Sequence, residues 1–108
     1  MRKAYIAGPY RADTEAGVEA NIQRAAALAR RLWTEGYAVF CPHMNSAHFG
    51  GIVPDEAFIR GDLAWLACAD VVFATEGWQV SEGARAEIEV AGALGIPVVL
   101  PEEEVKVG

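Results

Sequence analysis

The chain has little basic charge and no long apolar run. It contains 9 Lys and Arg residues and 15 Asp and Glu residues, which gives a formal net charge of −6 over 108 residues. This balance argues against binding a nucleic-acid polymer, because no basic stripe is present to neutralise phosphates. No apolar stretch approaches the ~18 residues of a membrane span. The opening MRKAYIAG is interrupted too soon for a signal peptide. We therefore expect a cytoplasmic protein without membrane contact.

Cysteine, metal-ligand spacing and the common nucleotide motifs are also scarce or absent. The two cysteines, Cys41 and Cys68, lie far apart in apolar surroundings, so we expect reduced core thiols. His43 and His48 have no third ligand nearby, so hydrogen bonding within their loop or substrate contact is favoured over a metal site. The phosphate loop G-x-x-x-x-G-K-[ST], the dinucleotide fingerprint G-x-G-x-x-G and the nucleophile elbow G-x-S-x-G are all missing. We expect neither a metal nor an organic cofactor.

What the chain does have is apolar content. Hydrophobic residues make up 53% of the sequence and the mean hydropathy is +0.16. These values are typical of an ordered fold, and the length suits one domain spanning residues 1–108. Because so small and apolar a chain leaves apolar surface exposed, we expect a homodimer or a higher homo-oligomer.

Short apolar segments alternate with helical patterns. Strands are predicted at Lys3–Ala7, Tyr37–Cys41, Asp70–Ala74 and Pro97–Leu100. Helices are predicted from about Glu19 to Glu35, with Trp33 on the buried side, and over Glu56–Ala69 and Ser81–Leu94. The connection Pro42–Pro54 is expected to be a functional loop without helix, and Thr75–Val80 a loop. The tail EEEVKVG is left open between an added edge strand and packing on a partner.

This alternation predicts an α/β three-layer sandwich, flavodoxin- or Rossmann-like, with a parallel sheet of four to five strands. Such sheets bind ligands at the carboxyl ends of their strands. Three segments meet at that edge: Gly8–Gly17, Pro42–Pro54 and Thr75–Ser81. We therefore expect the functional residues there.

Two acids stand on the apolar faces of their predicted helices. In Ser81–Leu94, Glu87 falls between Leu94 and Ala91, whereas the other charged residues take the opposite side. In Glu56–Ala69, Asp62 has Phe58 and Leu66 four residues away on either side. A carboxylate aimed at a core is costly unless it is paired, protonated or in a site. Each acid alone is compatible with a buried salt bridge or a first-turn carboxylate. The two together favour a shared site.

Two carboxylates at such an edge, with Tyr and Arg on the first loop, suggest glycosyl chemistry. In the retaining form, one acid attacks the anomeric carbon and the other handles protons. The surroundings must then push the two pKa values apart, and an apolar helix face is one way to do so.

Three segments together resemble the nucleoside 2-deoxyribosyltransferase superfamily. They are the opening YIAGPYR, the stretch RGDLAWLACADVVFA and the stretch SEGARAEIEVAGALGIPV, and they occur in order over nearly the whole chain. The resemblance implies that Glu87 is the nucleophile that forms a covalent sugar–enzyme intermediate. It implies that Asp62 orients the sugar hydroxyls or assists protonation of the leaving base, and that Tyr5 orients the nucleophile.

The remaining implied positions concern substrate binding. Arg11 and Ser81 match positions that contact the 5′-phosphate in the nucleotide-hydrolysing branch, and Gly8 lets the backbone approach the ligand. Each also has an ordinary structural explanation: Tyr5 as a core aromatic, Arg11 as a solvated charge, Gly8 as a turn residue and Ser81 as a helix cap.

The resulting functional prediction is an enzyme acting on a small nucleotide or nucleoside. It cleaves the N-glycosidic bond of a nucleoside 5′-monophosphate, or its 2′-deoxy form, and water resolves the glycosyl-Glu87 intermediate. Two alternatives stay open: a deoxyribosyltransferase that passes the sugar to a second base, and a non-catalytic nucleotide-binding module. The identity of the base is left open.

Overall fold

The computed structural model describes residues 1–47 and 49–105, the side chains of residues 104 and 105 excepted. The strands are β1 (Lys3–Ala7), β2 (Ala38–Phe40), β3 (Val71–Ala74) and β4 (Val98–Val99). The α-helices are α1 (Glu15–Thr34), α2 (Pro42–Asn45), α3 (Asp55–Leu66), α4 (Glu82–Ala93) and α5 (Pro101–Val105), and a 3₁₀ turn, η1, spans Trp78–Val80. Among the described residues, no helix combines the length and the apolar character needed to cross a membrane.

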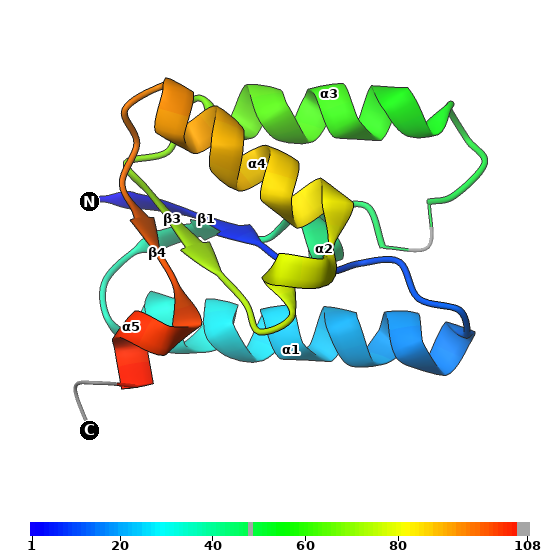
Figure 1. The fold of residues 1–108 in the computed structure, drawn as a ribbon, viewed down its shortest axis with the longest axis horizontal. Helices are drawn as coiled ribbons and strands as arrows, with labels where there is room; N and C mark the ends of the chain where they lie inside the picture. Colours follow the sequence, from blue (N-terminus) through cyan, green and yellow to red (C-terminus); the bar gives the residue numbers. More distant parts are fainter. Residues whose placement is uncertain (48, 106–108) are drawn as a thin grey trace.

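The four strands form one parallel sheet in the order β2-β1-β3-β4. Helices α3 and α4 lie on one face of this sheet and α1 lies on the other (Figure 1). The structure therefore confirms the predicted three-layer α/β fold with a four-stranded sheet. Because the chain runs from β1 outward to β2 and then returns to β3, the direction of winding reverses between β1 and β3. Ligands of doubly wound sheets bind at such a reversal.

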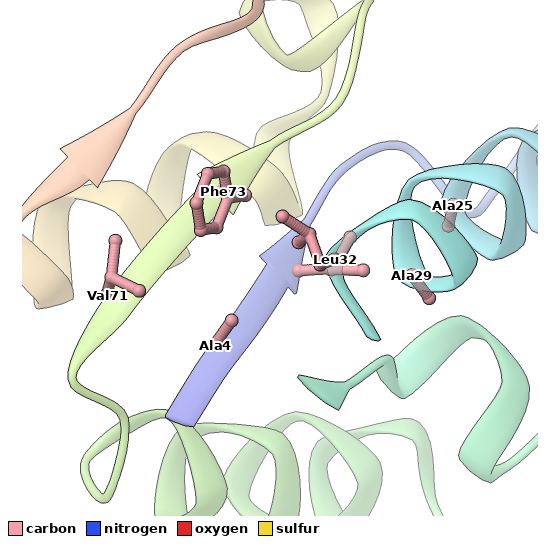
Figure 2. Packing of buried hydrophobic residues seen from close by; sticks show 7 residues of the cluster. Ala4, Ala25, Ala29, Leu32, Val71 and Phe73 are labelled. Atoms are coloured by element: carbon pink, nitrogen blue, oxygen red, sulfur yellow. The ribbon is translucent and has the colours of Figure 1, made fainter. Parts of the chain in front are cut away.

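Side-chain alternation along the strands builds two cores. On one face, Ala4, Val71 and Phe73 pack against Ala25, Ala29 and Leu32 of α1 (Figure 2). On the other face, the buried residues are Tyr5, Ala7, Leu66, Val72 and Ala91, contributed by β1, β3, α3 and α4. Tyr5 therefore points toward the two helices that carry Glu87 and Asp62.

Several predicted boundaries and faces are wrong. Helix α1 begins at Glu15 rather than near Glu19, because Thr14 caps it by accepting from the backbone N–H of Gly17. Trp33 is 54% exposed and not part of the core, because Leu32 already fills the position against the sheet. On α3, Ile59 and Trp65 are also exposed, so the buried face is narrower than the apolar pattern. Cys68 is an exposed free thiol rather than a core thiol.

Three segments expected to be irregular contain helical turns. The predicted loop Pro42–Pro54 opens with α2, where Pro42 occupies the first turn and loses no hydrogen bond there. The loop after β3 contains η1. The tail folds as α5 rather than as an edge strand, again with a proline in its first turn. The last three residues of the tail, 106–108, and His48 lie outside the described residues.

Candidate active site

Tyr5 and Glu87 form the centre of the candidate site. Tyr5 lies in the middle of β1, fully buried, and its hydroxyl donates a hydrogen bond to the Glu87 carboxylate on α4. The bond joins residues 82 positions apart in the chain. Glu87 itself is only half-buried, so it retains access to solvent. The tyrosine that packs in the core thus also orients an acid.

Asp62 on α3 acts electrostatically on both of these groups. Burial, and then the nearby charge of Asp62, raises the pKa of Glu87 to about 7, although the Tyr5 hydrogen bond works in the opposite direction. Burial also raises the pKa of Asp62 to about 6. Burial first, and then the Glu87 charge and hydrogen bond, raises the pKa of Tyr5, so its hydroxyl remains a donor. The structure thus brings Tyr5 and Glu87 into direct contact, with the charge of Asp62 near enough to act on both.

Neither acid is neutralised by a cation within the described part of the chain. The ion pairs found there join Lys3 to Asp70, Arg11 to Asp55 and Arg31 to Glu35. The surroundings of Glu87 and Asp62 therefore favour the protonated forms of both carboxyls. Two coupled acids that titrate near neutral pH can divide the roles of nucleophile and proton donor.

Gly8 follows β1 and is buried against Thr75, the residue that follows β3. A Cβ built on Gly8 would lie 1.9 Å from the Thr75 hydroxyl oxygen. The backbone N–H of Thr75 donates to the Ala7 carbonyl, which fixes the two strand ends side by side. The glycine is thus explained first by close packing between β1 and β3, at the reversal in the sheet.

Arg11 and Ser81 lie on loops at this same edge but not in contact with Glu87. Arg11 is exposed, and its guanidinium binds the Asp55 carboxylate at the start of α3 at 2.8 Å. Ser81 caps α4, as predicted, by accepting from the backbone N–H of Ala84 at 3.2 Å. The turn before Ser81 is held from α5, because Glu102 accepts from Trp78 and Gln79 at 3.3 and 3.2 Å.

The structure adds two residues that the sequence reasoning did not place in the site. Phe40 of β2 stacks on the Tyr5 ring with centroids 5.8 Å apart, and Trp65 of α3 stacks on Phe40 at 5.0 Å. Register could have indicated Phe40, since it pairs with Tyr5 across the sheet. Trp65 lies one turn beyond Asp62, so the aromatic stack extends from Tyr5 to the surface of α3, the helix that carries Asp62.

His43 is buried at 4% exposure and has a structural role. Its Nε2 atom lies 3.1 Å from the Gly8 carbonyl and 3.0 Å from the Pro9 carbonyl. This geometry agrees with the expectation of hydrogen bonding within the loop region. The described residues hold no group of three or more His, Cys, Asp or Glu side chains arranged to bind a metal ion.

Comparisons with known proteins add the family and the fold. A family model described as "Domain of unknown function (DUF4406)" matches residues 2–100. No curated protein is significantly similar to the chain. Among solved structures, the 2-deoxyribosyltransferase of the psychrotolerant bacterium Bacillus psychrosaccharolyticus superposes with a TM-score of 0.68 at 23% identity. That match covers 91% of this chain and 70% of the transferase.

A second similar structure is a conserved protein of Enterococcus faecalis V583, with a TM-score of 0.73 at 26% identity. The match covers 93% of this chain but spans only 62% of that protein. The chain therefore has the nucleoside 2-deoxyribosyltransferase-like fold, which confirms the resemblance drawn from its three sequence segments.

Proposed function

We propose an enzymatic activity for this chain, which belongs to the family described as "Domain of unknown function (DUF4406)". It cleaves the N-glycosidic bond of a nucleoside 5′-monophosphate, in the ribo or 2′-deoxy form. The observation that carries this proposal is the hydrogen bond from the buried Tyr5 hydroxyl to Glu87, with the charge of Asp62 acting on both groups. A neutral core would not retain two uncompensated acids. A binding surface for polymers would not place them against an apolar sheet face.

The chemistry requires Glu87 to be ionised and Asp62 to be protonated. Because their pKa values lie at about 7 and about 6, the two acids hold one proton between them near neutral pH, and the reactive form is the one with that proton on Asp62. The Glu87 carboxylate attacks the anomeric carbon, the N-glycosidic bond breaks, and its electron pair leaves with the base. The base takes a proton, delivered from Asp62 or with its assistance. Water then attacks the same carbon, one of its protons passes to the Asp62 carboxylate or to solvent, the bond from the carbon to Glu87 breaks, and Glu87 is released as a carboxylate. Tyr5 holds the attacking oxygen throughout, and the reaction as written needs neither metal nor cofactor.

Arg11 and Ser81 are the proposed contacts for the 5′-phosphate. Arginine binds phosphate through paired N–H groups, and a helix N-terminus such as that of α4 favours an anion. Both residues follow strands whose carboxyl ends meet at this edge of the sheet. The Arg11–Asp55 pair is exposed on both sides, at 77% and 69%, and such pairs are weak. A substrate phosphate can therefore displace Asp55.

A transferase is the second candidate, and the similarity to a solved 2-deoxyribosyltransferase favours it. In that case a second base, rather than water, attacks the glycosyl-Glu87 intermediate. The two reactions share Glu87, Asp62 and Tyr5 and differ only in the acceptor. A non-catalytic nucleotide-binding module would use the same edge of the sheet without turnover. The pairing of Glu87 with Tyr5 rather than with a cation argues against that module.

Chromatographic detection of free base distinguishes these three functions. The protein is incubated with ribo- and 2′-deoxynucleosides and with their 5′-monophosphates, with and without a second free base. Base released from monophosphates alone supports the hydrolase and a phosphate contact. A new nucleoside formed only with the second base supports the transferase. No product, together with a ligand-dependent rise in melting temperature, supports the binding module.

The first prediction concerns the nucleophile. Glu87→Gln keeps the size of the side chain and an acceptor for Tyr5, but it removes the attacking carboxylate. We expect base release to fall by at least about a thousandfold, in the range reported for loss of a catalytic nucleophile, with the circular dichroism spectrum unchanged. Glu89→Gln, on the exposed side of the same helix, is the matched control and should retain activity. Base release at the wild-type rate by Glu87→Gln would rule out this mechanism.

A further inference from the structure

In the loop after β1, the first four carbonyl groups, those of residues 8–11, are each hydrogen-bonded by one of two side chains. His43 Nε2 lies 3.1 Å from the Gly8 oxygen and 3.0 Å from the Pro9 oxygen. Asn21 Nδ2 lies 3.1 Å from the Tyr10 oxygen and 3.4 Å from the Arg11 oxygen. The two donors come from different elements, α2 and α1. His43 bonds residues 8 and 9, and Asn21 bonds residues 10 and 11.

Each donor is itself held in one orientation. Because carbonyl oxygens only accept, the His43 proton lies on Nε2, and Nδ1 faces the Cys41 thiol at 3.9 Å. His43 is also buried at 4% exposure. The Asn21 Oδ1 atom accepts from Arg24 at 2.9 Å, which turns the amide nitrogen toward the loop. Both side chains are therefore oriented so that a nitrogen donates hydrogen bonds to this loop.

Because these carbonyl groups are hydrogen-bonded to side chains, the backbone N–H groups of the same peptides point in the opposite directions. In a trans peptide the C=O of one residue and the N–H of the next point in opposite directions, and the structure has no cis peptide bond among its described residues. The N–H of Tyr10 thus points away from His43, which bonds the Pro9 carbonyl, and the N–H of Arg11 points away from Asn21, which bonds the Tyr10 carbonyl. Neither N–H has a hydrogen-bond partner within the described residues. Free successive N–H groups beside an arginine favour an anion.

We propose that His43 and Asn21 are positioning residues that hold the loop Gly8–Arg11 so that its backbone N–H groups and Arg11 receive the substrate's phosphate. This inference rests on the proposed function and deepens it, since it assigns the phosphate preference to two side chains that do not touch the substrate. The pair acts on binding of the monophosphate, whereas the Tyr5–Glu87 bond, made from other elements, carries the chemistry.

The test compares variants that keep or lose each donor. His43→Gln places an amide nitrogen near the position of Nε2, whereas His43→Leu has no donor. Asn21→Asp replaces the donating nitrogen by oxygen and keeps the acceptor for Arg24. We expect His43→Leu and Asn21→Asp to raise the KM for the monophosphate about tenfold, the loss typical of one or two hydrogen bonds. The kcat should fall far less, and His43→Gln should restore most of the KM.

The same variants are assayed with the matching nucleoside, which has no phosphate to place. The KM for the nucleoside should change much less than the KM for the monophosphate. Gln23→Ala, an exposed neighbour on α1, is the control for unspecific effects on that helix. Equal changes for nucleoside and monophosphate, or His43→Gln behaving like His43→Leu, would overturn the inference. If His43→Leu fails to fold, Asn21→Asp decides, since Asn21 is only partly buried.

A binding measurement separates this inference from the proposed function. Inorganic phosphate and a nucleoside 5′-monophosphate are titrated against wild type and Asn21→Asp, with the melting temperature as readout. If wild type releases no base but its stabilisation by monophosphate is lost in Asn21→Asp, the enzymatic proposal fails and the positioning role stands. If wild type releases base and Asn21→Asp binds monophosphate equally well, the positioning role fails and the enzyme stands.

Discussion

Glu87 experiences two opposing influences at the scale of a single residue. Burial against the sheet and the charge of Asp62 favour its protonated form, whereas the Tyr5 hydroxyl favours the anion. The resulting pKa of about 7 leaves both forms populated near neutral pH. A nucleophilic carboxylate benefits from this balance, because an anion held by one donor in apolar surroundings is more reactive than one solvated by water.

The second prediction is a pH dependence of stability that follows from this pKa. The ordinary pKa of the Glu carboxyl is 4.5, and folding raises it to about 7. Below pH 4.5 the carboxyl is protonated in both states, so its contribution to stability is fully present. As the pH rises from 4.5 through 7, the unfolded chain releases the proton first, and stability is lost. Asp62 shifts in the same direction, with a pKa raised from 3.8 to about 6.

Glu87→Gln should therefore be more stable than wild type above pH 7, by about 1–3 kcal/mol, and the difference should vanish near pH 4. Thermal or denaturant unfolding between pH 4 and pH 8 measures this difference. Glu89→Gln, whose carboxylate is exposed, should show no such trend. A stability difference that stays constant with pH would contradict the raised pKa of Glu87.

The third prediction concerns Gly8 and Thr75. In Gly8→Ala, the new Cβ would lie 1.9 Å from the Thr75 hydroxyl oxygen and 3.0 Å from its Cβ, so the two strand ends must separate. We expect a loss of about 1–3 kcal/mol in the free energy of unfolding. Adding Thr75→Ala removes the closest atom and should recover part of it, which a double-mutant cycle measures. Gly92→Ala, with nothing within 4 Å, should cost nothing. Additive losses would show that the pair is not in contact.

At the scale of elements, the exposed Arg11–Asp55 pair connects the loop after β1 to the first turn of α3, the helix that carries Asp62. It spans 44 positions of sequence, yet its free energy is small because both side chains remain in water. Its proposed consequence is competition: in the free protein, Asp55 occupies the guanidinium that the phosphate takes in the complex.

The fourth prediction tests this competition. Asp55→Asn should lower the KM for a nucleoside 5′-monophosphate about two- to fivefold at low salt, the range expected for an exposed ion pair. The gain should shrink as salt screens the charges. Glu56→Gln removes one negative charge from the same helical turn and is the matched control. Equal gains in both variants would indicate a general charge effect rather than competition for Arg11.

The sequence predicted these elements well wherever periodicity and breakers agree. The strand Lys3–Ala7 was predicted to the residue, because an apolar run ends at Gly8-Pro9. The cap by Ser81 was also confirmed. The short helices α2 and α5 were missed, because a single turn with proline in its first turn leaves no apolar period to detect. The carbonyl bonds of His43 could not be predicted either, since they depend on residues 34 and 35 positions away.

The same contrast holds for the candidate site. Glu87 and Asp62 were identifiable because each interrupts an apolar helix face, which is a local pattern. Their coupling to Tyr5 also agrees with the sheet order, since β1 lies at the centre beneath α3 and α4 (Figure 1). The roles of Arg11 and Ser81 remain predictions, because the ion pair with Asp55 and the helix cap account for their contacts in the free protein.

At the scale of the whole molecule, exposed apolar side chains gather at one edge of the sheet, the edge formed by β2. Strand β2 is the edge strand next to β1. Trp33 of α1 and Met44 of α2, each 54% exposed, line a hollow of about 300 Å³ together with Val39, Phe40, Cys41 and other β2 neighbours. Trp65, 56% exposed, stacks on Phe40 from the other face of the sheet. Apolar surface of this kind marks an interface more often than a solvated edge.

The fifth prediction is that two copies of the chain associate through this edge. A net charge of −6 repels copies at long range, so association requires apolar contact of the kind that Trp33, Met44 and Trp65 offer. Sedimentation velocity over a concentration series should show a dimer for wild type. Trp33→Lys and Trp65→Lys should each shift it toward monomer. Val80→Lys, at an even more exposed apolar residue on η1, should not. A monomer at every concentration, or an equal effect of Val80→Lys, would exclude this edge as the interface, and the catalytic groups of one chain would then have to suffice.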